Sequence, residues 1–184
     1  MKRKFALFLL WIFGWKLKGE FPKDIKKSII AFAPHTSYFD GFIGKIFFWA
    51  LGVPHKLLMK AAYFNCITRP FLNFLGFMPV GGVPGHNAIT ETAAMIKGAE
   101  TLNVLICPEE TLAPRKTWNP GYLLMAMKAK VPIVLGYLDY EKKEGGIFEV
   151  IDANLVGRKY VESRIREVYK KSMAKYPEKF ELPE

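Results

Sequence analysis

The sequence predicts a single α/β domain whose mostly parallel central sheet is flanked by helices and preceded by an apolar N-terminal helix. Two observations lead to this fold class. Apolar runs rich in β-branched residues alternate with longer segments of helical spacing, the pattern of a buried parallel sheet joined by crossover helices. The chain has 184 residues, of which 51% are hydrophobic, enough for one core without disulfides or metals.

Strands are expected wherever a short apolar run is bounded by polar or turn residues. Six segments meet this description: residues 28–33, 55–59, 77–80, 103–107, 131–137 and 148–153. Helices are expected between or after them, in five segments: residues 41–51, 70–75, 88–100, 121–130 and 160–176. The last of these carries basic residues around a narrow apolar stripe, which predicts a surface helix with a solvated outer side.

The N-terminus carries a continuous apolar run. Residues 2–4 are basic, residues 5–15 are apolar without a break, and lysines follow. The run is shorter than the about 20 residues that a spanning helix needs, and it lacks the small residues of a signal-peptide cleavage site. We therefore expect residues 1–18 to form a helix in the membrane interface, ahead of a globular domain over residues 19–184. The alternatives are a helix packed into the core and an uncleaved signal anchor.

The net charge of the chain is strongly positive. Lys and Arg number 27 against 17 Asp and Glu, a formal charge of +10, which favours an anionic partner. No nucleic-acid-binding motif is recognisable, so an anionic membrane surface is the expected partner and nucleic acid is not. The two cysteines have neither disulfide nor zinc-site spacing, which is typical of a reducing compartment. We expect a peripheral or monotopic protein on the cytoplasmic face of the membrane.

A candidate catalytic pair follows the first predicted strand. His35 comes just after that strand, and Ser37 with Asp40 three residues later forms a capping box that opens a helix. The turn between strand and helix lets the Asp40 carboxylate reach back to the imidazole. A carboxylate that orients a neutral imidazole is the arrangement of a general base, which would act here on a substrate hydroxyl. The competing interpretation is a capped helix beside a histidine with a purely structural role.

A second polar segment follows another buried strand. Glu109 and Thr111 come directly after the run 104–107, and parallel strands bring such loops to one edge of a sheet. The loop continues with Arg115 and Lys116 beside aromatic and proline residues, a composition suited to an anionic headgroup. We expect both loops to line one site.

At these residues the sequence resembles the glycerolipid acyltransferase family, which includes the 1-acylglycerol-3-phosphate acyltransferases, over residues 30–137. His35 and Asp40 match the family's His-x4-Asp motif, with Pro34 where Asn is usual. The family's apolar Val-Pro-Ile block is matched at residues 131–133. Its Pro-Glu-Gly-Thr-Arg motif is matched only in part, because Glu110 and Leu112 stand where Gly and Arg are usual. In the remaining block, Gly81 and Gly82 replace an acidic residue and an arginine.

The resemblance implies an acyl thioester donor, carried by coenzyme A or acyl carrier protein, and no bound cofactor or metal. It implies a lipid acceptor whose hydroxyl becomes acylated in phospholipid or lipid biosynthesis. Residues implied in substrate binding are Ser37, Glu109, Thr111, Arg115 and Lys116. Since the two phosphate-binding arginines are missing, the acceptor is expected to differ from lysophosphatidic acid, and His86 is a candidate substitute donor. The alternative is a non-enzymatic lipid-binding protein at the membrane surface.

Overall fold

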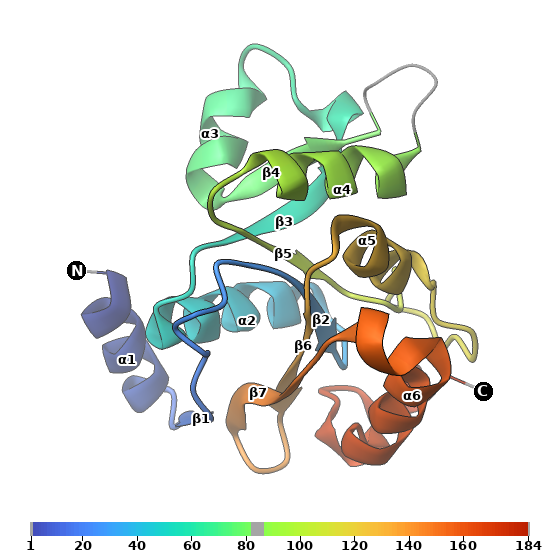
Figure 1. Ribbon diagram of the computed structural model, residues 1–184. Helices are drawn as coiled ribbons and strands as arrows, with labels where there is room; N and C mark the ends of the chain where they lie inside the picture. The colour runs from blue at the N-terminus through green and yellow to red at the C-terminus, as the bar shows by residue number, and fades with distance from the viewer. Residues whose placement is uncertain (1, 82–86, 184) are drawn as a thin grey trace.

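The protein is represented by a computed structural model that describes residues 2–81 and 87–183. Its centre is a sheet with the strand order β1-β7-β6-β2-β5-β3-β4 (Figure 1). The strands are β1 (Lys16–Lys18), β2 (Lys27–Ala33), β3 (His55–Lys60), β4 (Phe77–Val80), β5 (Leu102–Ile106), β6 (Ile133–Asp139) and β7 (Glu144–Ile151). Five neighbouring strands, from β6 to β4, run parallel, so the predicted parallel sheet is confirmed.

Helices cover both faces of the sheet (Figure 1). They are α1 (Lys2–Ile12), α2 (Tyr38–Leu51), α3 (Thr68–Leu75), α4 (Ala88–Gly98), α5 (Gly121–Ala129) and α6 (Ala153–Val168). One core cluster joins α1 and α2 to the sheet, and another joins α4, α5 and α6 to the opposite face. Central strand β2 contributes alternate residues to both clusters, which explains why its sequence is apolar without alternation.

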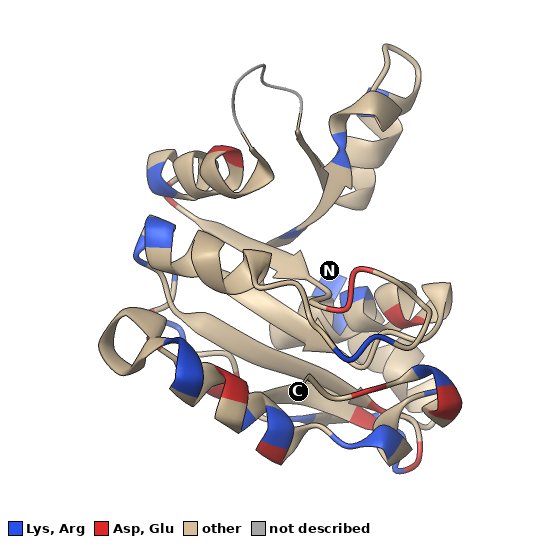
Figure 2. Cartoon of the chain, turned by 90° about the vertical axis from the view of Figure 1, so that its right-hand side faces the viewer, with Lys and Arg blue, Asp and Glu red and all other residues tan. Residues whose placement is uncertain are grey.

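The sequence-based boundaries are wrong at one edge of the sheet, where β1 and β7 lie, and for the last helix. The strand predicted at residues 148–153 begins at Glu144 and runs antiparallel to β6, and short β1 was not predicted. The helix predicted at 160–176 covers 153–168 with a kink at Gly157. It ends because Tyr169 turns into the core, where its hydroxyl donates to the carbonyls of Ala31 and Gly136 at 3.1 and 2.8 Å. The outward side of α6 carries both basic and acidic residues, as expected for a solvated helix (Figure 2).

Only one side of helix α1 packs on the rest of the protein, although its apolar run has large apolar residues on all sides. Ala6 and Leu10 are buried against α2, and Lys16–Lys18 pairs with β7, so part of the N-terminal segment belongs to the core. This corrects the expectation that the apolar run stays out of the core. The other side of α1 exposes Phe5, Phe8 and Trp11, which are 55%, 54% and 75% accessible.

The division of the chain at residue 18 stays a prediction. Within the described residues, no helix combines the length and the apolar character that crossing a bilayer requires.

Candidate active site

His35 lies in the turn between the carboxyl end of β2 and the start of α2. Ser37 is the N-cap of α2, and its Oγ accepts a hydrogen bond from the amide of Phe39 at 3.1 Å. The Asp40 carboxylate accepts from the amides of Thr36 and Ser37 at 2.7 and 2.8 Å, which completes the predicted capping box. The turn therefore wraps around the buried carboxylate, which fixes the backbone directly after the histidine.

The imidazole and the carboxylate are close but not hydrogen-bonded. His35 Nδ1 lies 3.7 Å from Asp40 Oδ2 and has no other partner, although it is buried. Catalytic hydrogen bonds are often long without substrate and shorten in the complex, so this spacing suits a base and its orienting carboxylate. Burial lowers the pKa of His35 below 6.5, and the nearby Asp40 raises it by a smaller amount. The ring is therefore neutral at pH 7 and able to accept a proton.

Asp40→Asn is expected to lower kcat by about 100-fold or more, because the amide cannot stabilise the imidazolium that forms during proton transfer. It should also move the acidic limb of the kcat/KM profile to lower pH, since Asp40 raises the pKa of His35 and its removal lowers that pKa further. The measurement is kcat/KM for acyl transfer by the wild type and by Asp40→Asn, from about pH 4.5 to about pH 8. An unchanged limb with normal turnover would show that Asp40 is only a helix cap.

Glu109 supports the histidine from the turn that follows the neighbouring strand β5. Its Oε1 accepts from the His35 amide at 2.9 Å, while its Oε2 is buried without a partner. Burial raises the pKa of Glu109 to about 8; nearby Asp40 also raises it, and the bond from His35 lowers it. The side chain is therefore a neutral carboxylic acid at pH 7. It anchors the His35 backbone without adding a second negative charge beside Asp40.

Glu109→Gln is expected to stabilise the protein at neutral and alkaline pH. The wild-type carboxyl ionises near pH 4.5 when unfolded and near pH 8 when folded, so stability declines as pH rises between these values. Glutamine keeps the acceptor for the His35 amide and does not titrate, so at pH 7 the gain is roughly 3 kcal/mol.

Urea unfolding at several pH values measures this gain, which should shrink below about 1 kcal/mol at pH 5. The exposed Glu20→Gln is the matched control and should leave the pH dependence of stability unchanged. If the gain in the free energy of unfolding were equal at all pH values, the inference that Glu109 is a neutral, buried acid would be wrong.

A cavity of about 760 Å³ opens beside the histidine. His35 lines it together with apolar side chains from β3, β5 and α5, including Leu57, Leu105 and Met125. Polar groups come from Lys60, Glu110, Asn119 and Tyr122. A mostly aliphatic cavity of this volume with a neutral imidazole in its wall has room for a fatty acyl chain.

Comparison with known proteins identifies the fold. No protein-family model and no curated protein sequence matches the chain. The crystal structure of the 1-acyl-sn-glycerophosphate (LPA) acyltransferase PlsC from Thermotoga maritima is similar, with a TM-score of 0.60 and 17% sequence identity, covering 90% of this chain and 76% of that one. The chain has the fold of this acyltransferase. The resemblance found in the motifs is confirmed at the level of the fold.

The remaining predicted site residues lie on the loop that follows β5 and do not line the cavity. Thr111 Oγ1 accepts from the amide of Ala113 at 3.2 Å, which shapes the loop after β5. Arg115 is exposed and lies 4.0 Å from Glu110, whose φ of 55° is the left-handed conformation that favours the glycine usual at this position. Lys116 is exposed on the same loop. The structure thus places Thr111, Arg115 and Lys116 on one loop beyond the cavity.

The positions of the missing arginines differ in what surrounds them. Gly81 lines the cavity, and its amide donates to Glu91 Oε2 at 2.7 Å. Gly82 and His86 lie outside the described residues. Leu112 is partly buried on the loop after β5. The described part of the chain contains no group of three or more His, Cys, Asp or Glu residues that could hold a metal ion.

Two polar residues of the site were not predicted from the sequence. Tyr140, directly after β6, donates its hydroxyl to Asp40 Oδ1 at 2.6 Å and so completes the bonding of that carboxylate. Lys60, the last residue of β3, brings a cation to the cavity. Both stand at the carboxyl ends of parallel strands, the same edge as His35 and Glu109. Their position at the carboxyl ends of parallel strands is the feature by which Tyr140 and Lys60 could have been identified as site residues.

Proposed function

We propose that the protein is an acyltransferase that moves a fatty acyl group from a thioester to a hydroxyl of a lipid acceptor. The observation that carries this proposal is the neutral His35, held beside the buried Asp40, in the wall of a mostly aliphatic cavity. The fold shared with the T. maritima acyltransferase supports the same activity. The donor is acyl-coenzyme A or acyl carrier protein, and no cofactor is needed.

The reaction follows from the chemistry of these groups. His35 takes the proton from the acceptor hydroxyl as its oxygen attacks the thioester carbonyl. The carbon–sulfur bond breaks, and the leaving thiolate receives that proton from the imidazolium, which yields an ester and a free thiol. Cys107 lines the cavity, but burial raises the pKa of its thiol well above the usual range, so it is a poor nucleophile. Direct transfer to the acceptor is therefore favoured over a covalent enzyme intermediate.

The proposed place of action is the cytoplasmic face of an anionic membrane. The exposed apolar side of α1 supports this placement. A second exposed group stands next to His35 on the first turns of α2, where Tyr38, Phe39 and Phe42 are 88%, 53% and 57% accessible. These aromatic side chains would enter the interface and bring the cavity level with lipid substrates.

Lysophosphatidic acid is expected to be a poor acceptor, at least about tenfold lower in kcat/KM than a lysolipid whose headgroup lacks a phosphate monoester. Among the described lining residues, a dianionic phosphate would face one lysine, Lys60, one acidic residue, Glu110, and no arginine, and lysine lacks the bidentate fork of arginine. Free-thiol release from acyl-coenzyme A with a panel of lysolipids and acylated amino acids measures this. Efficient acylation of lysophosphatidic acid would contradict it and would direct attention to Arg115→Ala.

The same assay separates the enzyme from the alternative of a lipid-binding protein without activity. That alternative is favoured by the missing arginines and by the absence of a direct His35–Asp40 hydrogen bond in the described chain. Acceptor-dependent thiol release that disappears with His35→Ala supports the transferase. Lipid binding without thiol release from either donor supports the alternative.

A further inference from the structure

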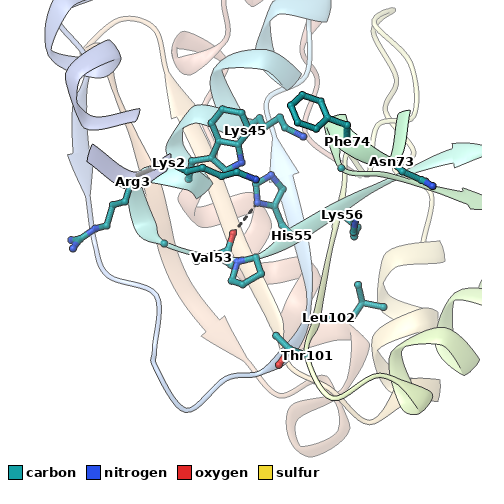
Figure 3. A pocket seen from close by; sticks show the side chains of 14 residues that line it. Lys2, Arg3, Lys45, Val53, His55, Lys56, Asn73, Phe74, Thr101 and Leu102 are labelled. Atoms are coloured by element: carbon teal, nitrogen blue, oxygen red, sulfur yellow. Dashed lines mark hydrogen bonds between the residues drawn. The ribbon is translucent and has the colours of Figure 1, made fainter. Parts of the chain in front are cut away.

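A second cavity, of about 600 Å³, lies at the opposite edge of the sheet from His35. His55 and Leu102 line it, and these are the first residues of the parallel strands β3 and β5, whereas His35 follows the carboxyl end of β2. Its other walls come from the start of α1, the second half of α2 and the end of α3 (Figure 3). We call this cavity the basic pocket.

Four basic side chains from three elements line the basic pocket: Lys2, Arg3, Lys45 and Lys56 (Figure 3). No acidic residue of the described chain is among its lining residues. The ammonium groups of Lys2 and Lys45 lie 5.9 and 5.5 Å from the centre of the Trp49 ring, so they share one aromatic surface. Arg3 donates from Nε to the carbonyl of Ala50 at 3.0 Å, which leaves the outer nitrogens of its guanidinium for another acceptor.

These charges are not balanced within the pocket. Burial lowers the pKa of Lys45, and the positive charges of Lys56 and Lys2 lower it further. His55 adds no charge, because burial lowers its pKa to about 4, although the hydrogen bond that its Nδ1 donates to the Val53 carbonyl at 3.0 Å raises that pKa by a smaller amount. The C-terminal ends of α2 and α3 each offer about half a negative charge, which offsets only part of four cations. A bound anion would relieve the remaining repulsion.

The side chains around the pocket indicate what kind of molecule carries that anion. Phe74 lines the pocket and is 80% exposed, and Phe71 on the same helix is 62% exposed. On the other side stands α1, which exposes Phe5 and Phe8. A soluble phosphate would make no use of these apolar side chains, whereas a lipid would place its phosphate among the lysines and its glycerol and acyl portions beside the aromatic rings.

We propose that the basic pocket binds the phosphate of an anionic phospholipid headgroup from the bilayer, at a site separate from the cavity at His35. The proposal rests on the membrane contact proposed for α1 and is independent of acyl transfer. Such a site would fix the orientation of the protein on an anionic leaflet.

The test is co-sedimentation with vesicles of phosphatidylcholine alone and of phosphatidylcholine mixed with phosphatidylglycerol. The variant Lys45→Gln/Lys56→Gln should bind the mixed vesicles at least about tenfold more weakly, with binding to phosphatidylcholine alone unchanged. The matched control is Lys159→Gln/Lys171→Gln, which removes the same charge from exposed positions in α6 and the turn after it. The control should change binding to the mixed vesicles by about twofold or less.

Two results would overturn the proposal. An equal loss of binding in the control pair would mean that diffuse surface charge, and not the pocket, recognises the anionic lipid. The second arm titrates the vesicle-free protein with inorganic phosphate and with coenzyme A by calorimetry. Tight binding of either that depends on Lys45 and Lys56 would assign the pocket to a soluble phosphate compound instead, whereas no binding of either supports the lipid.

Discussion

His35→Ala is expected to lower kcat/KM for acyl transfer by about 10² to 10⁴-fold, the usual contribution of a general base. No other residue on the described wall of the cavity combines a neutral, basic nitrogen with a neighbouring carboxylate. The fold should survive, because the His35 side chain makes no hydrogen bond among the described residues and the structural bond to Glu109 comes from its backbone amide.

The measurement is thiol release from acyl-coenzyme A and from acyl carrier protein, with thermal unfolding and vesicle binding recorded on the same protein. The thermal unfolding and the vesicle binding of His35→Ala should match those of the wild type. If turnover stays within about tenfold of the wild type while the protein is folded, His35 is not the general base and the proposed mechanism is wrong.

Replacing Phe5, Phe8 and Trp11 together by Ser is expected to weaken vesicle binding by at least about a hundredfold. Each large apolar side chain that leaves water gains about 1.5 to 3 kcal/mol when fully buried, and partial insertion of three still exceeds the roughly 2.7 kcal/mol of a hundredfold change. Helix α1 should stay folded and docked, because Ala6 and Leu10 remain in contact with α2.

The matched control replaces three exposed apolar residues of α6, Leu155, Val156 and Tyr160, by Ser and should leave vesicle binding unchanged. Activity on acceptors in vesicles should fall much more than activity on a water-soluble short-chain acceptor, since only the former needs the membrane. High salt should weaken the wild-type interaction without abolishing it, because lysines add to the apolar contribution. Undiminished vesicle binding by the α1 variant would assign the membrane contact to another surface.

Local sequence patterns determined much of the fold and the centre of the site. The runs that became β2, β5 and β6 are mostly apolar along their length, because each is buried on both faces. The capping box at Ser37 and Asp40 is an interaction between residues three apart, so it was readable directly and located His35 beside the first turn of α2.

The tertiary structure decided what depends on strand order and on contacts between distant segments. Tyr140 meets Asp40 across 100 residues of sequence because β6 lies next to β2, an adjacency that no local periodicity encodes. The same holds for β7, whose direction is set by its pairing with β6, and for α1, whose uniformly apolar sequence does not reveal which side packs on α2. The basic pocket is also of this kind. Its lysines form no pattern in the sequence, and only the packing of α1, α2 and β3 brings Lys2 and Lys45 over the Trp49 ring and Lys56 to the same cavity.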